Sequence, residues 1–175
     1  MAAFDIGKRN VLTRDPNNPD YNVAAGKACS RGLEADMAGQ SNRYWRLTVS
    51  VAWLDTKVTC NNDATLLGKR LMNIPRISGS LFAMYEDSLP DGSRYGVGGG
   101  VVYVGERTAN ATDTWRPPGC TTVRLHGYWQ LDLRIRLTME VHNLFDRGHY
   151  LASWNRAAVI PGMGRQLVVG VQWRL

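Results

Sequence analysis

Hydrophobic and polar residues alternate with a period of two along most of this chain. Residues 44–55, the sequence YWRLTVSVAWLD, place Arg46, Thr48, Ser50 and Ala52 on one side of an extended strand and five large apolar residues on the other. This period indicates strands whose two faces meet different environments. No stretch of useful length carries the stripe of an amphipathic helix.

The alternation predicts about eight strands and therefore an all-β fold, an antiparallel meander of amphipathic strands. The segment 76–86, RISGSLFAMYE, alternates poorly, so its two faces are not assigned. The expected strands cover residues 3–12, 29–38, 44–55, 76–86, 95–106, 123–130, 134–143 and 165–175.

The connections between these strands also alternate, here in length. Short turns are expected at GQSNR, SLPDGSR and LDL. The other connections between strands are expected to be long loops. Outer-membrane barrels have short periplasmic turns and long external loops. The pattern therefore predicts part of a transmembrane β-barrel, with Met1 and Leu175 on the periplasmic side.

Two turns predict a register. Centring LDL on Asp132 and GQSNR on Ser41 keeps apolar residues opposite one another, as an unbroken apolar face requires. It also places Arg124 opposite Glu140 and Asp36 opposite Arg46, so both pairs are expected as cross-strand ion pairs on the polar face.

The apolar face is expected to meet lipid. Residues 45–53 span roughly 26 Å before tilt, close to the ~25 Å apolar band of a membrane barrel. Such a band is flanked by aromatic girdles. The candidates for these girdles are Trp45, Trp53, Tyr103, Trp129 and Trp173. A soluble barrel with an apolar core and a small ligand is the alternative, and it predicts solubility without detergent.

The net charge and the cysteine spacing exclude fewer classes of protein than the alternation does. The net charge is +6, but the Lys and Arg residues are scattered, so we expect no nucleic-acid partner. No apolar run approaches the ~18 residues of a membrane helix, and MAAFDIGKRN does not resemble a signal peptide. Cys29, Cys60 and Cys120 lack zinc-site spacing; a Cys60–Cys120 disulfide or free thiols both remain open.

Six motifs, in order along nearly the whole chain, resemble the TonB-dependent siderophore receptors of Gram-negative outer membranes. They are FDIGKRNVLTRDP, SRGLEADMAG, GKRLMNIPRISGSLFAMYE, YGVGGGVVYVGER, VHNLFDRGHY and PGMGRQLVVGVQWRL. The chain departs from the family's pattern at Leu175, where a terminal Phe is usual, at Cys120, where Tyr is usual, and at Gly164, where Pro is common.

The resemblance explains why the chain stops on the strand RQLVVGVQWRL. In the family the last strand closes the barrel against the first strand, and its alternating apolar residues resemble the signal read by the outer-membrane assembly machinery. The residues that carry this signal here are Leu167, Val169, Val171, Trp173 and Leu175.

Family members are longer, with a plugged barrel of 22 strands. The resemblance therefore implies that residues 1–175 are the C-terminal segment of the barrel, without the plug domain and the N-terminal strands. We expect a fragment of a receptor that imports ferric siderophores across the outer membrane. TonB would act only through the missing N-terminal part, and the fragment alone would not transport. A stand-alone barrel of eight strands is an alternative.

The resemblance assigns no binding residue, since these vary with the siderophore. Cationic and aromatic loop residues suit an anionic, often aryl-bearing chelate. On that basis we expect contacts from Arg107, Trp115, Tyr150, Trp154 and Arg156. We expect no cofactor, no metal site and no enzyme, since there is no G-x-S-x-G motif and the register sets His126 and His142 opposite Thr138 and Thr122.

Overall fold

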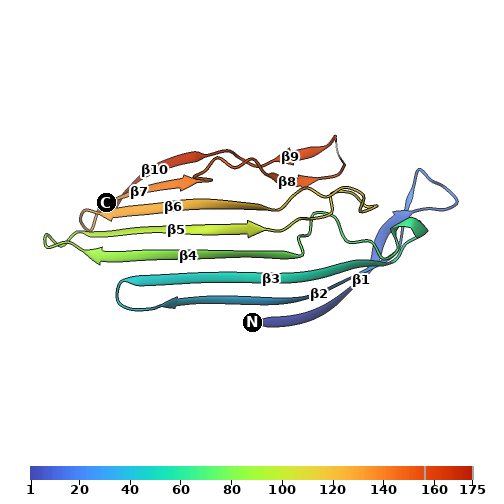
Figure 1. Cartoon of the computed structure of the whole chain (residues 1–175), viewed down its shortest axis with the longest axis horizontal. Coiled ribbons are helices and arrows are strands. Elements are labelled where there is room, and N and C mark those ends of the chain that lie inside the picture. The colour runs from blue at the N-terminus through green and yellow to red at the C-terminus, as the bar shows by residue number, and fades with distance from the viewer. Residues whose placement is uncertain (156, 175) are drawn as a thin grey trace.

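The computed structural model describes residues 1–155 and 157–174 and contains one large antiparallel sheet. Its strands follow in the order β1-β2-β3-β4-β5-β6-β7-β10, and consecutive strands lie side by side (Figure 1). They are β1 (Ala2–Arg14), β2 (Asn22–Gln40), β3 (Trp45–Cys60), β4 (Ile77–Ser88), β5 (Arg94–Val104), β6 (Cys120–Gln130), β7 (Ile135–His142) and β10 (Gln166–Trp173). The expected eight-stranded meander is thus confirmed.

The short turns lie at one end of the sheet and the long loops at the other (Figure 1). The long loop after β7 contains a small hairpin that the alternation did not predict, formed by β8 (Tyr150–Ser153) and β9 (Val159–Pro161). The loop after β3 carries a single 3₁₀ turn, Ala64–Leu66. The described residues include no helix with the length and hydropathy needed to cross a membrane.

The pairing places large apolar side chains in continuous rows on one face of the sheet. Val49 of β3 pairs with Leu81 of β4, which pairs with Val101 of β5. The rows at the two ends of this apolar face carry the aromatic residues: Trp53 and Tyr103 lie toward the long loops, whereas Trp45, Trp129 and Trp173 lie toward the short turns. The structure also assigns the faces of β4, since Leu81 is on the apolar face and Ser80 and Phe82 are on the other.

The sheet is a single layer without a core of its own. Among the described residues, only Ala28, Met84, Ala109 and Pro117 are buried with apolar side chains, although the chain is 44% hydrophobic. Side chains such as Met37, Leu167 and Val169 are 62–68% exposed. Exposed apolar surface on this scale marks a face that meets lipid or another protein.

Both predicted ion pairs are wrong, because the strands pair in a different register. The four side chains nevertheless lie on the polar face, as predicted. Asp36 pairs with Ser50 and not with Arg46, and Glu140 pairs with His126 and not with Arg124. The cause is the turn geometry. In both turns an Asx side chain, Asn42 or Asp132, accepts hydrogen bonds from the N–H groups two and three residues later, at 2.7–3.0 Å.

These Asx turns set the reversal of the chain. The N–H of Ser41 donates to the carbonyl oxygen of Trp45, and the N–H of Leu131 to that of Ile135. The centres therefore lie at positions 43 and 133, not at Ser41 and Asp132. Each shift moves the pairing by an even number of residues, so every side chain keeps its face.

The first prediction tests this register by disulfide formation, in a receptor containing this chain and with the native cysteines replaced by serine. Ala38→Cys with Thr48→Cys should crosslink under mild oxidation, because these residues are direct partners, and direct partners lie within disulfide range. Asp36→Cys with Arg46→Cys is the control and should stay reduced, since the two residues are four positions out of register. Crosslinking of the control alone would contradict the register.

Candidate functional site

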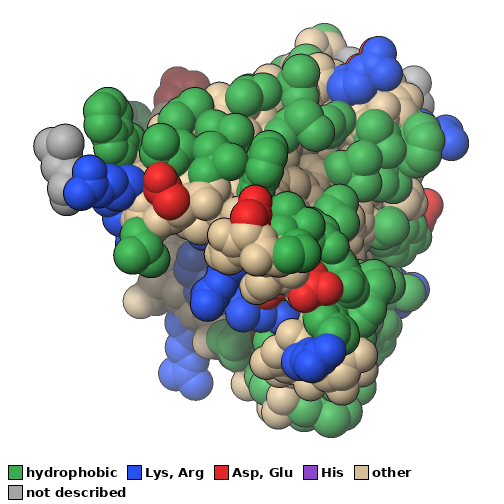
Figure 2. Space-filling view, turned by 90° about the vertical axis from the view of Figure 1, so that its left-hand side faces the viewer, with side chains coloured by type: hydrophobic (Ala, Val, Ile, Leu, Met, Phe, Trp, Pro, Cys, Tyr) green, Lys and Arg blue, Asp and Glu red, His purple; other side chains and the backbone are tan. Residues whose placement is uncertain are grey.

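The polar face and the loops that fold over its long-loop end are the candidate functional surface. Figure 2 looks onto the short-turn end: hydrophobic side chains dominate much of the outline, and several Lys and Arg side chains gather in a hollow. A pocket of about 410 Å³ lies at this end of the polar face. Its lining includes Arg43, Arg46, Glu86, Arg94 and Tyr128.

One network of polar contacts holds this pocket together. Glu86 accepts from the Nε of Arg46 at 2.7 Å and from the hydroxyl of Tyr128 at 2.6 Å. The guanidinium of Arg136 lies over the Tyr128 ring, 3.8 Å from its centroid. The sequence predicted Arg46 in an ion pair but gave the wrong partner: the carboxylate belongs to β4, not to Asp36 of β2.

A second polar cluster lies further along the same face and contains two of the three histidines. His126 Nδ1 is 3.2 Å from Glu140 Oε1, and His142 Nε2 is 3.0 Å from Glu140 Oε2. The expectation that both rings face threonines is therefore wrong, again because the register of β6 against β7 is shifted by two residues.

Glycines of β5 make room for the larger side chains of this face. A Cβ at Gly96 would lie 2.3 Å from the Tyr128 ring, and one at Gly100 would lie 2.7 Å from the Phe82 ring. Side chains from the neighbouring strands therefore lean over β5, which only glycine permits at this approach. The glycine-rich sequence YGVGGGVVYV thus serves packing on the polar face.

The long loops form a compact unit of their own. Asn73 ties two of them together: its Nδ2 donates to the carbonyl oxygen of Ser153 at 2.9 Å, and its Oδ1 accepts from the Ser153 N–H at 2.9 Å. Its own N–H donates to the carbonyl oxygen of Thr108 at 2.8 Å. Thr108, Ala109 and Ser153 are fully buried. The Asn-x-Pro-Arg motif was visible in the sequence, but nothing in its spacing indicated this partner 80 residues away.

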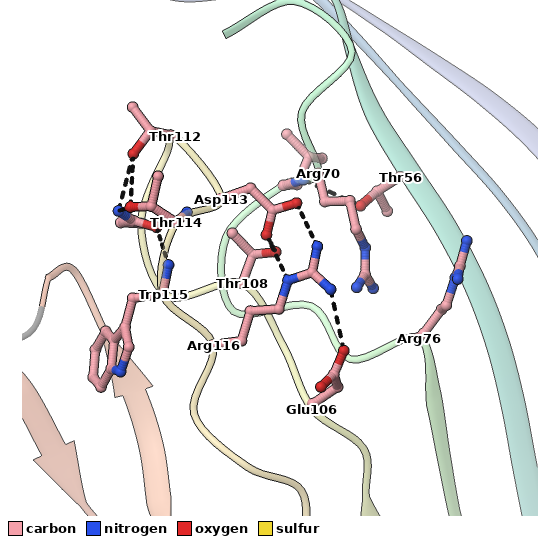
Figure 3. A network of polar contacts seen from close by, with 12 residues as sticks. Thr56, Arg70, Arg76, Glu106, Thr108, Thr112, Asp113, Thr114, Trp115 and Arg116 are labelled. Atoms are coloured by element: carbon pink, nitrogen blue, oxygen red, sulfur yellow. Dashed lines mark hydrogen bonds and ion pairs between the residues drawn. The ribbon is translucent and has the colours of Figure 1, made fainter.

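Figure 3 shows the ionic part of this loop unit. Arg116 contacts both Asp113, at 2.8 Å, and Glu106, at 3.2 Å. Thr108 donates its hydroxyl to Asp113 at 2.7 Å. The hydrogen bond from Arg116 is the main cause that lowers the pKa of Asp113, and Thr108 and the charge of Arg70 add to it.

The expected ligand contacts lie in these loops, in different settings. Arg107 is 8% exposed and donates to the carbonyl oxygen of Tyr150, so its side chain joins two loops. Trp115 is half-buried beside Ala109, whereas Tyr150 and Trp154 are 42% and 59% exposed. Arg156 lies outside the described residues. The structure thus brings Arg107 and Tyr150 together, and ligand contact by any of these residues stays a prediction.

The remaining expectations concern β10 and the cysteines. Leu167, Val169, Val171 and Trp173 share the exposed apolar face, whereas Leu175 lies outside the described residues. The described residues give β10 one partner, β7, and none on its other edge. Cys29, Cys60 and Cys120 are free, so the structure contains thiols and not the Cys60–Cys120 disulfide.

An amphipathic antiparallel sheet with aromatic rows at both ends of its apolar face defines the wall of a membrane β-barrel. The family model of the TonB-dependent receptor-like β-barrel matches residues 1–144, and the chain belongs to this family. It is 39% identical over 98% of its length to the metal-pseudopaline receptor of Pseudomonas aeruginosa, strain UCBPP-PA14. It is 25% identical over 99% of its length to the ferrichrome outer membrane transporter/phage receptor of Escherichia coli K12.

Solved structures agree on the fold. The siderophore receptor PiuA from Acinetobacter baumannii superposes with a TM-score of 0.83 over 98% of this chain, at 20% identity. The chain covers 25% of that receptor, and 24% and 23% of the two relatives above. It therefore spans about a quarter of the length of the relatives it matches. Barrels of this family are outer-membrane proteins, which confirms the expected location.

The second prediction concerns the stability of the loop unit at acid pH. The contacts of Asp113 favour its carboxylate, so they stabilise the loops above the ordinary Asp pKa of about 3.9 and this contribution is lost as the pH falls through the lowered pKa. Resistance of residues 105–119 to pepsin, followed by mass spectrometry, should therefore persist at pH 4 and decline below it. Asp113→Asn should decrease resistance at pH 4, where pepsin is active, and remove the acid dependence; an unchanged acid profile in this variant would contradict the assignment.

Proposed function

We propose that this chain forms the C-terminal part of the wall of an outer-membrane receptor that imports ferric siderophores or similar metal chelates, with energy supplied through TonB. The observation that carries the proposal is the open, single-layered sheet with one apolar and one polar face. Membership of the TonB-dependent receptor family supports it. The relatives that match nearly the whole chain are named as receptors and transporters, and we propose no catalytic role.

The edges of the sheet support a larger barrel. In the described residues β1 pairs only with β2, and β10 only with β7. Each unsatisfied backbone group in lipid costs several kcal/mol, so open edges in the membrane would cost tens. We infer that further strands of the receptor pair with both edges. A plug inside the complete barrel would lie against the polar face and provide the contact with TonB.

The two alternatives raised by the sequence need a closed sheet. A stand-alone eight-stranded barrel, or a soluble barrel around a small ligand, would pair β1 with β10. No such pairing occurs among the described residues. The large apolar side chains of the apolar face are exposed, which does not fit a soluble barrel, because its apolar residues would pack inside.

The external loops are the proposed entry of the chelate. Tyr150 and Trp154 are exposed there, and Trp115 is half-buried close to the same junction of loops. Aromatic side chains of this kind suit aryl or cationic parts of a ligand. Arg107 is proposed to act here by holding Tyr150 in place, because its guanidinium is already engaged with the Tyr150 backbone.

The third prediction separates the two faces with neighbouring residues of β3. Val49→Arg places a charge in the middle of the apolar face, which costs about 2–4 kcal/mol at the bilayer midplane, and should sharply reduce assembled receptor in outer-membrane fractions. Ser50→Arg is the matched control; it lies on the polar face opposite Asp36 and should assemble normally. Immunoblots of outer-membrane fractions, run with and without heating to distinguish folded from unfolded barrel, measure the amount of assembled receptor for both variants. Equal assembly of the two variants would refute the assignment of the lipid-facing side.

The fourth prediction tests transport. A strain lacking the gene region that encodes this chain should grow worse than its parent when either iron is restricted by bipyridyl or zinc by EDTA. An excess of the restricted free metal should restore growth, because it bypasses the chelate receptor, and so should the complete gene. Growth equal to the parent under both restrictions would overturn the proposed function.

A further inference from the structure

The β8–β9 hairpin is too small to hold its own position. Its two strands, Tyr150–Ser153 and Val159–Pro161, pair at only three positions, and the described residues give this sheet no third strand. An isolated two-stranded hairpin is marginally stable at best in water. The place of this hairpin among the loops must therefore be set by contacts from outside it.

The side chain of Asn73 contacts the hairpin in the manner of a neighbouring strand. Both backbone groups of Ser153 bond to the Asn73 amide: Nδ2 donates to the carbonyl oxygen and Oδ1 accepts from the N–H, each at 2.9 Å. Two such bonds to one residue are the pattern of a hydrogen-bonded cross-strand pair. Ser153 is fully buried, so neither backbone group can turn to water instead. The amide thus takes the place of a third strand.

Asn73 is itself held by another loop. Its backbone has a φ of 60°, in the left-handed region that Asn and Asp enter more readily than most other residues with a side chain. In this conformation its N–H donates to the carbonyl oxygen of Thr108 at 2.8 Å. Pro75, two residues later, forms a β-bridge with Arg107. Asn73 therefore ties the hairpin to the loop after β3 and to the loop after β5 at once.

The Asn73–Ser153 pair lies next to the exposed aromatic residues of the hairpin. Trp154 directly follows Ser153 and is 59% exposed, and Tyr150 at the start of β8 is 42% exposed. Arg107 donates to the carbonyl oxygen of Tyr150, so β8 is held at both of its ends. Side chains presented by a fixed backbone lose less freedom on binding a ligand than side chains on a mobile loop.

We propose that Asn73 is a positioning residue for ligand recognition: its amide fixes the β8–β9 hairpin, so that Tyr150 and Trp154 are presented to the chelate in one arrangement. This inference rests on the proposed function and adds to it a residue that does not itself touch the chelate. An amide suits this role because it is a donor and an acceptor at once.

Asn73→Asp tests the amide alone, because the two side chains have the same shape and both tolerate the left-handed backbone. The carboxylate still accepts from the Ser153 N–H, but its second oxygen faces the Ser153 carbonyl oxygen and has no hydrogen to donate. In the complete receptor, purified in detergent, the amides of residues 150–154 should exchange with deuterium about tenfold faster than in the wild type at pH 7, as measured by mass spectrometry.

Asn110→Asp is the matched control. The Asn110 side chain is half-buried in the same loop unit, but its hydrogen bonds stay within its own loop, to Thr112, Thr114 and Trp115. This variant should leave the exchange of residues 150–154 as in the wild type, because it does not touch the hairpin.

Acid provides a second readout. A protonated Asp has one O–H donor and one carbonyl acceptor, the same pair that the amide offers. At pH 4, close to the ordinary Asp pKa of about 3.9, this form can rebuild both bonds, while the contacts of Asp113 still hold. The excess exchange of Asn73→Asp over the wild type should therefore shrink from pH 7 to pH 4. Asn73→Gly keeps the left-handed backbone without any side-chain donor, so its excess should persist at both pH values.

Metal uptake separates positioning from folding. The probe is ⁵⁵Fe or ⁶⁵Zn added to culture fluid of the parent strain grown under the matching metal restriction, so that the chelator is the strain's own. Cells with Asn73→Asp should need a several-fold higher concentration of labelled metal for half-maximal uptake, with unchanged maximal uptake per assembled receptor. Asn110→Asp should match the wild type in both quantities.

Three outcomes would overturn the inference: wild-type exchange of residues 150–154 in Asn73→Asp at pH 7, faster exchange that acid does not reduce, or faster exchange with an unchanged half-maximal concentration. Asn73→Gly applies the first and third of these tests independently of whether Asn73→Asp assembles. A failure of the proposed function is recognised separately, because cells without the receptor would then take up as much metal as wild-type cells, whatever the exchange results.

Discussion

Each strand of the main sheet depends on backbone hydrogen bonds to its neighbours, because the sheet is a single layer and no second layer of the described residues packs across it. Ladders join every neighbouring pair of strands in the main sheet, with pairings of fourteen residues between β2 and β3 and eleven between β4 and β5. Only four apolar residues are buried among those described, so the usual hydrophobic core contributes little. Stability must come from the ladder and from the lipid and protein that meet the two faces.

The same constraint explains the polar face. Charged side chains there have few ways to be satisfied except by one another, and the strands provide partners through register. Glu86 serves Arg46 and Tyr128, and Glu140 serves His126 and His142. Each carboxylate uses both of its oxygens. The glycines of β5 leave the space that these long side chains need. A network of this kind is sensitive to a register shift, because moving one strand by two residues separates every pair.

The loops are stabilised differently, since most of their backbone groups do not take part in the hydrogen-bond ladder of the sheet. They build a compact unit from side-chain hydrogen bonds to the backbone, with Asn73 and Arg107 each joining segments far apart in sequence. This unit holds the exposed side chains of Tyr150 and Trp154 at the long-loop end of the sheet.

The sequence by itself determined the fold class, the number of strands in the main sheet and, except in β4, the face on which each side chain of these strands lies. The reason is physical: a period of two fixes the face of every residue once one is known, and an error of two or four residues in pairing does not change it. The family was also evident, because six motifs occur in order. The short β8–β9 hairpin was missed because three or four residues carry too little alternation to distinguish a strand from a loop.

Only the tertiary structure decided which residues meet. Asn42 and Asp132 shift two turns by local hydrogen bonds, and those shifts replaced Asp36–Arg46 and Arg124–Glu140 with other pairs. Arg107, a predicted ligand residue, donates to the backbone carbonyl of Tyr150, a contact that the sequence did not indicate because loop packing depends on contacts between distant segments. The pocket at the short-turn end joins residues of β3, β4, β5 and β6. Alternation gives each strand its two faces, but the side-chain neighbours along those faces depend on turn geometry, which pattern alone does not encode.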